Sequence, residues 1–376
     1  MQTQTAVGSD LRITCSRDEL TRRLSVVARA VSTRASVQIL AGVLLRSGEG
    51  AVTVAATDME LSLRSELEAD VVGEGSLVIP GRLLVDVTRL LPESEVVIDH
   101  RGEENVARIS CGGASYALNT YNAEDFPRLP EPESAQLFSV DRVALLETAG
   151  RVSRAASRDE SRPVLTGVLV RVESGKLVMV ATDSYRLSVK ETPLEGSDLP
   201  ELEAIVPARA LAELTRIAGS GDEIELGIHE NHVFFSADGV SLTTRRIDGQ
   251  FPNHKQLIPE AFEHELRLPR SELLDVVRRT AVLAQRNSPL RLRFEEGEVT
   301  VSAQTQDVGE ARESMPIPFS GEPLEIGFNA EFLRDGLESV AEDEVLLRLI
   351  SPLRPGLIQS TAGDFSYLIM PIRLAG

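Results

Sequence analysis

Arginine pairs seven residues apart are the clearest chemical pattern in this sequence. Seven residues make two helical turns to within about 20°, so both members of a pair lie on one face of a helix. Arginines at this spacing supply positive charge without an arrangement that reads bases, which favours contact with phosphate backbones. The pairs are Arg22 and Arg29, Arg82 and Arg89, Arg151 and Arg158, Arg209 and Arg216, and Arg279 and Arg286. Arg154, within the third pair, is assigned to the same surface.

The helices that must carry these arginines differ in charge from the rest of the chain. The formal net charge of −19 ordinarily argues against a nucleic-acid partner. The predicted helices hold 17 Arg and 11 Asp or Glu, so they carry +6 while the remainder carries −25. They span 17–31, 82–91, 141–158, 209–218, 270–286 and 329–340. For one helix a solvated face is the simpler interpretation, but recurrence in five of six helices favours a phosphate-binding surface.

Signatures of common enzyme classes are absent. The sequence has no G-x-x-x-x-G-K-[ST] loop, no H-E-x-x-H and no G-x-S-x-G. His229 and His232 flank an expected turn at Glu230-Asn231, so a surface loop is favoured there over a metal site. No nucleophile has a base beside it, and the sequence predicts no catalytic residue.

Two Thr-Asp pairs remain as candidate polar sites, Thr57-Asp58 and Thr182-Asp183. Asp58 and Glu60 could ligate a cation, but the second copy of the motif has no acid at the position of Glu60. We therefore expect each pair to tie a strand end to its turn through side-chain hydrogen bonds. The sequence predicts no metal and no cofactor.

Composition indicates an ordinary globular protein of more than one domain. The chain has 376 residues, of which 42% are hydrophobic and 26% charged. Cys15 and Cys111 are too few for a disulfide framework, which favours a reducing cytoplasm. The N-terminus lacks a basic start followed by an apolar core, and no run of 18 apolar residues occurs. We expect a cytoplasmic protein without a membrane segment.

Internal repetition organises the chain. Residues 161–189 nearly repeat residues 36–63 at an offset of 125, with Gly42 matching Gly167 and Asp58 matching Asp183. A weaker third copy begins at residue 290, where LRLRFEEGEVTVSA aligns with VLLRSGEGAVTVAA at an offset of 247. The sequence therefore predicts three domains built on one plan.

Each repeat combines two helices with short alternating strands. This pattern predicts an α+β fold with antiparallel sheets and helices on one face. The predicted parts are a loose polar tail at 1–9, domains at 10–126, 137–252 and 265–376, and linkers at 127–136 and 253–264.

Local signals fix several element boundaries. Ser16 and Glu19 have the form of a capping box, in which each side chain bonds the other residue's backbone amide. A turn is expected at Ser174-Gly175, between two strands. Residues 365–374 are predicted to form the last strand.

Together with the threefold repeat, three segments carry a family resemblance. ATDSYRL at 181–187, QFPNHKQLIP at 250–259 and YLIMPIRL at 367–374 resemble the bacterial DNA sliding clamp, the beta subunit of DNA polymerase III. The resemblance implies a non-enzymatic processivity factor that forms a head-to-tail homodimer. Its six domains would make a ring around duplex DNA, with twelve helices lining the hole and acidic sheets outside.

The resemblance also implies a set of partners at the nucleoid. A clamp loader ATPase would place the ring on DNA without regard to sequence. Replicative and other DNA polymerases and repair proteins would bind through short peptides with Gln and Leu or Phe anchors. The family's peptide pocket maps to Leu165, Thr182, Ser184, Tyr185, Arg186, Leu187, Pro252, Leu257, Leu368, Ile369, Met370, Pro371, Ile372 and Arg373.

The same resemblance implies a ring joint between the first and third domains. Tyr116 and Leu118 would face Val282 and Leu283 of the other copy. The alternative is that these four residues are ordinary core positions.

Two other functions stay open on the residues alone. One is a repeat-built protein-interaction scaffold whose arginines form salt bridges and which never encircles DNA. The other is a nucleic-acid enzyme with an acidic site formed by Asp58, Glu60 and Asp183, which is disfavoured because these acids do not recur as a cluster.

Overall fold

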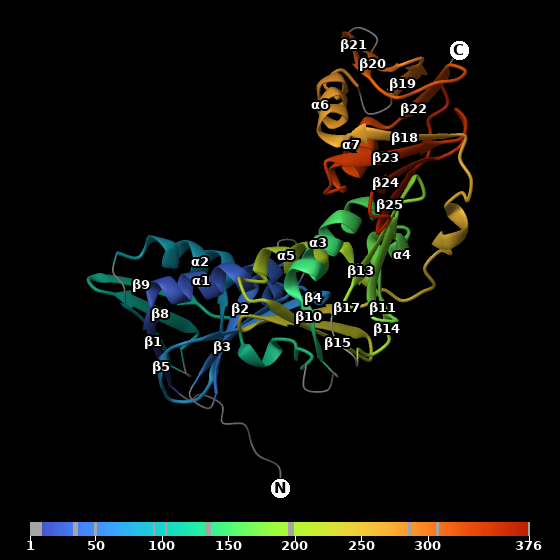
Figure 1. Cartoon of the computed structure of the whole chain (residues 1–376). Helices are drawn as coiled ribbons and strands as arrows, with labels where there is room; N and C mark the ends of the chain where they lie inside the picture. The colour runs from blue at the N-terminus through green and yellow to red at the C-terminus, as the bar shows by residue number, and fades with distance from the viewer. Residues whose placement is uncertain are drawn as a thin grey trace. The chain divides into compact units, whose positions relative to one another are not determined.

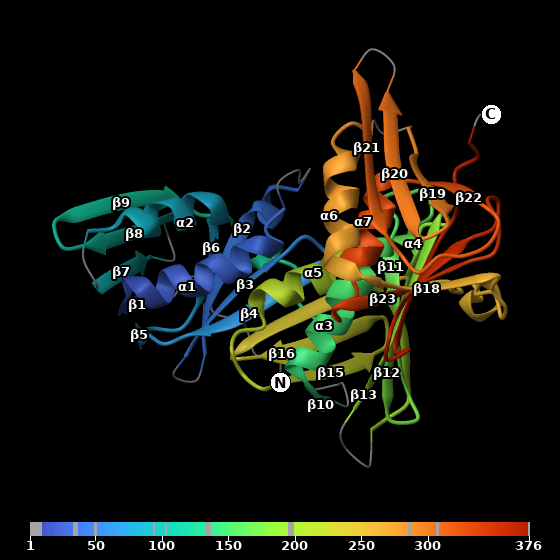
Figure 2. The same cartoon turned by 45° about the horizontal axis from the view of Figure 1, so that its top comes forward.

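The computed structural model describes residues 10–32, 37–48, 51–92, 95–101, 104–131, 137–194, 199–284, 288–305 and 308–374. The chain forms two compact units, residues 1–142 with 213–245 and residues 143–212 with 246–376. Figure 1 and Figure 2 show the elements of each unit. The predicted tail, residues 132–136 of the predicted linker and Arg286 lie outside the described residues.

The first unit contains two antiparallel sheets, arranged β5-β1-β7-β8-β9 and β10-β15-β16-β17-β4-β3-β2-β6. The strands of the five-stranded sheet are β1 (Leu11–Ser16), β5 (Asp70–Val72), β7 (Glu95–His100), β8 (Val106–Cys111) and β9 (Ala114–Asn119). Those of the eight-stranded sheet are β2 (Gly42–Ser47), β3 (Val52–Thr57), β4 (Leu61–Leu67), β6 (Ser76–Pro80), β10 (Phe138–Asp141), β15 (Glu223–His229), β16 (His232–Ala237) and β17 (Val240–Arg245).

The second unit repeats this arrangement with an eight-stranded sheet, β14-β11-β12-β13-β25-β24-β23-β18, and a four-stranded one, β21-β20-β19-β22. The strands of the larger sheet are β11 (Gly167–Glu173), β12 (Lys176–Thr182), β13 (Arg186–Pro193), β14 (Leu202–Pro207), β18 (His264–Pro269), β23 (Glu344–Leu349), β24 (Gly356–Ser360) and β25 (Phe365–Ile369). Those of the smaller sheet are β19 (Leu290–Glu295), β20 (Glu298–Thr305), β21 (Gly309–Pro316) and β22 (Leu324–Phe328). Pairing is antiparallel throughout the described residues, as predicted.

All six predicted helices are confirmed, and each begins within one residue of its predicted start. The helices are α1 (Arg17–Val27), α2 (Gly81–Leu90), α3 (Arg142–Val152), α4 (Pro163–Thr166), α5 (Ala208–Ile217), α6 (Arg270–Ala281) and α7 (Ala330–Glu338). All six end earlier than predicted, three of them by four residues or more. After α1 and α3 the chain tightens into 3₁₀ turns at Ala28–Ala30 and Ser153–Ala155, and α6 stops at Ala281.

Apolar residues at helical spacing form the buried face of α1. Leu20, Leu24 and Val27 are fully buried, and the helix packs over β3 and β4. α1 and α2 lie side by side in the first unit, as α6 and α7 do in the second (Figure 1 and Figure 2). The helical layers are thus built from amphipathic faces.

The predicted capping box is only half present. The backbone N–H of Glu19 donates to Ser16 Oγ at 3.1 Å, so the N-cap is confirmed. The Glu19 carboxylate instead accepts hydrogen bonds from Arg22 Nε at 2.9 Å and Arg23 Nε at 2.6 Å. Two guanidinium groups one turn further along outcompete the neutral amide, because charge-assisted bonds are stronger.

The last strand is shorter than predicted. β25 ends at Ile369, whereas the sequence predicted a strand through Leu374. Pro371 follows two residues later and has no N–H to donate to a ladder. The expected turn at Ser174-Gly175 is confirmed, because both residues have positive φ and Glu173 pairs with Lys176 across it.

The repeats are joined by strand pairing at one register. In the first unit β17 pairs with β4, and Val240 faces Ser65. In the second unit β25 pairs with β13, and Phe365 faces Lys190, each residue 125 positions further along. Both junctions therefore continue a sheet from one repeat into the next.

Two glycines on helices of the second unit provide a test of packing at this junction. A Cβ on Gly336 would lie 2.6 Å from Tyr367 Cδ1, whereas a Cβ on exposed Gly150 would meet nothing within 4 Å. We expect Gly336→Ala to lower the free energy of unfolding by about 1–3 kcal/mol through overpacking. Gly150→Ala should raise it by about 0.5–1 kcal/mol through helix propensity. Calorimetric melting checks both, and shifts of the same sign would contradict this description.

Candidate functional site

A tight turn after β12 organises the predicted pocket. Thr182 Oγ1 donates to the carbonyl oxygen of Arg186 at 2.7 Å. Asp183 Oδ1 accepts the backbone N–H groups of Tyr185 at 2.9 Å and Arg186 at 3.0 Å. Ser184 adopts a positive φ of 81° at the tip. The prediction that Thr182-Asp183 ties a strand end to its turn is confirmed.

The first repeat builds the same turn from Thr57-Asp58. Thr57 Oγ1 donates to the carbonyl oxygen of Leu61 at 3.0 Å, and Asp58 Oδ1 accepts from the backbone N–H of Glu60 at 3.1 Å. Met59 has a φ of 78°, as Ser184 has in the second repeat. The carboxylate of Asp58 is therefore occupied by its own turn.

Arg186 is a buried cation directly beneath the pocket turn. Only 6% of its side chain is exposed, and its Nε donates to Asp183 Oδ2 at 3.0 Å. Its Nη1 donates to Asp335 Oδ2 at 2.6 Å and to Tyr367 Oη at 3.3 Å. The guanidinium also lies 4.1 Å from the centre of the Phe332 ring. Arg186 thus links β13, α7 and β25.

The protonation of this cluster follows from its geometry. Burial disfavours the charge of Arg186, but Tyr367, Asp335 and Asp183 outweigh it, so the pKa of Arg186 lies above its usual value. Burial also raises the pKa of Tyr367, which stays a neutral hydroxyl. The guanidinium therefore remains charged across the physiological range.

The C-terminal segment is fixed against the same turn. The backbone N–H of Met370 donates to the carbonyl oxygen of Tyr185 at 2.8 Å, and that of Ile372 donates to Gly327 at 2.8 Å. Leu368 faces Leu187 across the β13–β25 pair. Segments about 180 residues apart in sequence therefore meet at one place.

An apolar cluster, here called the pocket cluster, forms the floor of this region. Its buried members are Leu169, Val180, Leu187, Ile205, Leu357 and Leu368, and partly buried residues packed against it are Val164, Val178, Val189, Ile247, Phe251, Ile258 and Phe262. Exposed apolar side chains occur at three predicted pocket positions: Tyr185 is 63% exposed, Leu257 49% and Met370 42%. Exposed large apolar side chains of this kind are available to a partner.

The structure places the predicted pocket residues at different depths. Leu165, Thr182, Arg186, Leu187, Leu368 and Ile369 are buried; Pro371 and Ile372 are half-buried; Ser184, Tyr185, Pro252, Leu257, Met370 and Arg373 are exposed. Sequence reasoning missed the contribution of Ile247 and Phe251. The available signal was Phe251, which repeats Phe126 at an offset of 125, and Phe126 belongs to the equivalent cluster in the first unit.

Two hollows lie in the second unit near the pocket cluster. One of about 290 Å³ is bordered by Asp183, Tyr185, Arg186 and Phe332. The other, here called the linker cavity, measures about 600 Å³ and lies among β11, β14 and residues 246–255.

The helix arginines differ in exposure and pairing. Exposed members of the predicted set are Arg22, Arg29, Arg82, Arg89, Arg154, Arg158, Arg209, Arg216 and Arg279. The side chain of Arg29 is 35% exposed and pairs with Glu213, and that of Arg151 is 15% exposed and pairs with Glu147. Arg82 has no ion-pair partner among the described residues.

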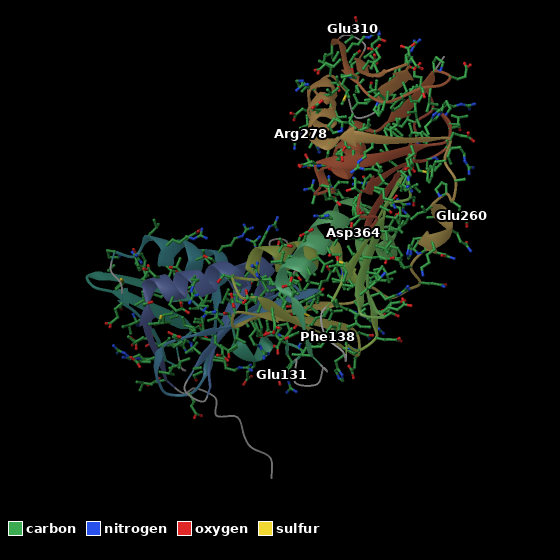
Figure 3. The ribbon with its side chains drawn as sticks, viewed as in Figure 1. Glu131, Phe138, Glu260, Arg278, Glu310 and Asp364 are labelled. Atoms are coloured by element: carbon green, nitrogen blue, oxygen red, sulfur yellow. The ribbon has the colours of Figure 1, made fainter. Side chains whose placement is uncertain are left out.

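Acidic residues neutralise several of these arginines. Arg216 pairs with Glu213 at 2.6 Å, and Arg279 pairs with Glu313 at 2.8 Å. Glu338 accepts from Arg154 and from Arg278, which is labelled in Figure 3. Burial raises the pKa of Glu338, but the hydrogen bonds and charges of these two arginines outweigh it and hold the pKa below its ordinary value.

The predicted ring-joint residues lie on or near free edges. Tyr116 is 38% exposed and Leu118 is buried, both on β9, which is an edge strand. Val282 is 80% exposed just after α6, and Leu283 is half-buried. α6 packs against β21, the edge strand that carries Glu310 (Figure 3).

The described residues form neither a metal-binding group nor a membrane-spanning helix. No group of three or more His, Cys, Asp or Glu side chains in the described ranges is placed to hold a metal ion. None of the described helices has the length and hydropathy to cross a membrane.

The buried cluster around Arg186 makes a stability prediction. Arg186→Met should lower the free energy of unfolding by about 3–5 kcal/mol, because it leaves Asp183 and Asp335 buried without their cation. Arg162→Met, which removes an exposed arginine of the same unit, should change it by less than about 1 kcal/mol. Chemical denaturation measures both variants. A loss below about 1 kcal/mol for Arg186→Met would mean that the cluster is not a stabilising unit.

Comparisons with known proteins agree along the whole chain. Family models of the DNA polymerase III beta subunit match residues 11–130 (N-terminal domain), 139–253 (central domain) and 255–373 (C-terminal domain). The beta sliding clamp of Streptomyces coelicolor is 32% identical over 381 residues, and that of Synechococcus elongatus is 34% identical over 376. Each alignment covers 97% of this chain and all of the relative.

Solved structures agree as well. The Bacillus subtilis DNA polymerase sliding clamp superposes with a TM-score of 0.92 at 26% identity, covering 97% of this chain and all of that one. The C. crescentus beta sliding clamp gives 0.92 at 28% identity, covering 98% and 100%. The chain therefore belongs to the bacterial beta sliding clamp family, whose members are the non-catalytic processivity subunit of DNA polymerase III.

Proposed function

We propose that two copies of this chain close head to tail into a ring around duplex DNA. The observation that carries the proposal is the repeated sheet junction. β17 of the second repeat pairs with β4 of the first, and β25 of the third pairs with β13 of the second. The equivalent strands left without such a partner are β9 of the first repeat and β21 of the third. A head-to-tail contact between copies supplies both of these edges with a partner.

The internal junctions also give the register of the intermolecular pair. The hairpins Ala237–Val240 and Cys111–Ala114 both enclose two residues, so Ala114 is equivalent to Val240. In the third repeat, Glu313 faces Val301 as Ser65 faces Val54. Because Val240 pairs with Ser65, we expect Ala114 to face Glu313 of the other copy.

Comparison of the two junctions within the chain with the proposed contact between copies supports an apolar ring joint. Arg29 and Arg154 lie in the 3₁₀ turns after α1 and α3, each twelve residues after the first residue of the preceding helix, and both form ion pairs. The equivalent position after the start of α6 is Val282, which is 80% exposed. An apolar side chain at this place fits contact with Tyr116, and with the buried Leu118 and half-buried Leu283 beside them.

The helix arginines would meet the phosphates inside the ring. Arg82, Arg89, Arg209 and Arg216 occupy equivalent faces of α2 and α5, and all four are exposed. Contact through charge alone is independent of sequence and weak enough to let the ring move. The acidic remainder of the chain would repel DNA outside the hole, and closure supplies the retention that weak contacts lack.

Partner proteins would bind to the turn at residues 182–186, to the pocket cluster and to the C-terminal segment at residues 368–373. An extended peptide with a Gln and Leu or Phe anchors fits an apolar groove whose rim is Tyr185, Leu257 and Met370. The partners are the clamp loader ATPase, replicative and other DNA polymerases, and repair proteins. The ring would act in the cytoplasm at the nucleoid.

DNA topology provides the direct test of the ring. After loading by a clamp loader and a high-salt wash, the protein should stay on circular duplex DNA and run off linear ends. Replacing Arg82, Arg89, Arg209 and Arg216 by Glu should lower the amount of protein loaded onto circles at moderate salt by about tenfold or more, because phosphate contacts become repulsive.

A charge-matched variant controls this experiment. Its four substitutions to Glu fall on exposed arginines outside the helices: Arg12, Arg101, Arg293 and Arg354. This control should behave as the wild type does. Equal loss of the wild type from circles and linear DNA would refute the ring and leave a protein-interaction scaffold.

The ring joint has its own test in sedimentation velocity. Val282→Asp should weaken the dimer on the order of 30-fold, because it buries an unpaired charge in an apolar joint. Val143→Asp is the matched control, since Val143 is a 56% exposed valine at the start of α3. If both variants remain dimeric at the same concentration, Val282 does not lie in the interface.

A further inference from the structure

The linker cavity is not used by the function proposed above. Its walls come from β11 and β14 on one side and from residues 246–255 on the other, all within the second unit. At about 600 Å³ it is large enough for two or three side chains of a bound ligand. Three of its lining residues carry positive charge: Arg171, Arg246 and Lys255.

His254 is a polar residue in the wall of this cavity. It is 7% exposed as a whole residue. Its ring nitrogens are not among the fully enclosed side-chain atoms that lack a partner, so they are open to a ligand in the cavity. Burial, Arg171 and Lys255 hold the pKa of His254 below its ordinary value, so near neutral pH the ring presents one N–H donor.

The cations around His254 are only partly neutralised. Arg171 pairs with Glu203 at 2.6 Å and with Glu173 at 3.6 Å. Arg246 and Lys255 have no carboxylate within ion-pair distance in the described part of the chain. These two residues are therefore the lining cations that remain available to a ligand.

The cavity is continuous with the proposed peptide groove. Leu169, Ile205, Ile247 and Phe251 line it and also belong to, or pack against, the pocket cluster that contains Leu187 and Leu368. Pro252 lines the cavity as well and is one of the predicted pocket residues. A peptide anchored on the pocket cluster would therefore lie beside the linker cavity.

We propose that the linker cavity binds the carboxylates of acidic residues that flank the apolar anchor of a partner peptide. This inference rests on the proposed peptide-binding function. The occupant is a polypeptide because the cavity adjoins the peptide groove, and its acids are Asp or Glu because Arg246, Lys255 and the His254 N–H donate to carboxylate oxygens. The cavity would select among partners by the charge next to the anchor.

Fluorescence anisotropy with four labelled peptides tests the proposal on the full-length protein. All share one Gln and Leu/Phe anchor; one has neutral flanks, one carries two Glu before the anchor, one carries two Glu after it, and one has a scrambled anchor. One of the two acidic peptides should bind the wild type about three- to fivefold more tightly than the neutral peptide at low salt, the range of a partly exposed ion pair. Arg246→Glu should abolish this difference and leave the affinity for the neutral peptide unchanged.

Matched variants separate the cavity from general charge. Arg354→Glu makes the same charge change at an exposed arginine outside the cavity and should preserve the preference. His254→Phe keeps a buried ring without its N–H and should reduce the preference while the neutral peptide still binds. Arg246→Gln gives a milder version of the first change should Arg246→Glu fail to fold.

The possible results distinguish the role of the linker cavity from that of the peptide groove. Equal binding of the neutral and acidic peptides, or a preference that survives Arg246→Glu, overturns the inference and leaves the peptide groove standing. Binding of none of the anchored peptides better than the scrambled one overturns both. A variant lacking residues 371–376 should bind none of them, which ties the signal to the groove.

Discussion

The fold depends on strand pairing between successive repeats. A strand at the edge of a sheet leaves N–H and C=O groups unpaired, and in this chain β4 and β13 receive their missing partners from β17 and β25 of the next repeat. The register is the same at both junctions, so each repeat is added in the same manner. The strands equivalent to those of the junctions, β9 in the first repeat and β21 in the third, have no such partner within the described chain. A single chain therefore leaves the backbone groups of these two edge strands unpaired. This favours assembly of two chains into a closed ring.

The two junctions share a backbone but differ in chemistry. At the first, Leu61 and Leu242 are buried where the second has Arg186 and Tyr367. Above them, Ser62 and Thr243 pair where the second junction has Leu187 and Leu368. The first junction is thus apolar beneath and polar on its outer face, and the second is charged beneath and apolar outside. This inversion explains how a repeated turn gives one apolar groove, at the second junction, without a change of fold.

The sequence predicted features that depend on neighbours along the chain. Helix starts followed from caps and periodicity, and the turn at Ser174-Gly175 from its residue types. The predictions were wrong or incomplete where the local structure depends on residues far away in sequence or on competing hydrogen-bond partners. Glu19 binds Arg22 and Arg23 instead of closing a capping box, and the final strand stops before Pro371. The burial of Arg186 depends on Asp335 and Tyr367, about 150 and 180 residues away, so no local pattern distinguishes it from a surface arginine. The contribution of Ile247 to the pocket cluster likewise depends on a residue that is not a neighbour along the chain, because its backbone N–H donates to the carbonyl oxygen of Ile205.

The pairing of helix arginines with acids bears on how a clamp can hold DNA without stopping. Glu213 and Glu338 each accept from two arginines, and Glu19 also accepts from Arg22. The arginine side chains of these pairs are 35–64% exposed, so in the proposed ring such an arginine can exchange its carboxylate for a passing phosphate. A surface of fully unpaired arginines would bind each phosphate more tightly and resist movement. Partial neutralisation keeps single contacts weak, and retention is then left to the closed backbone of the ring.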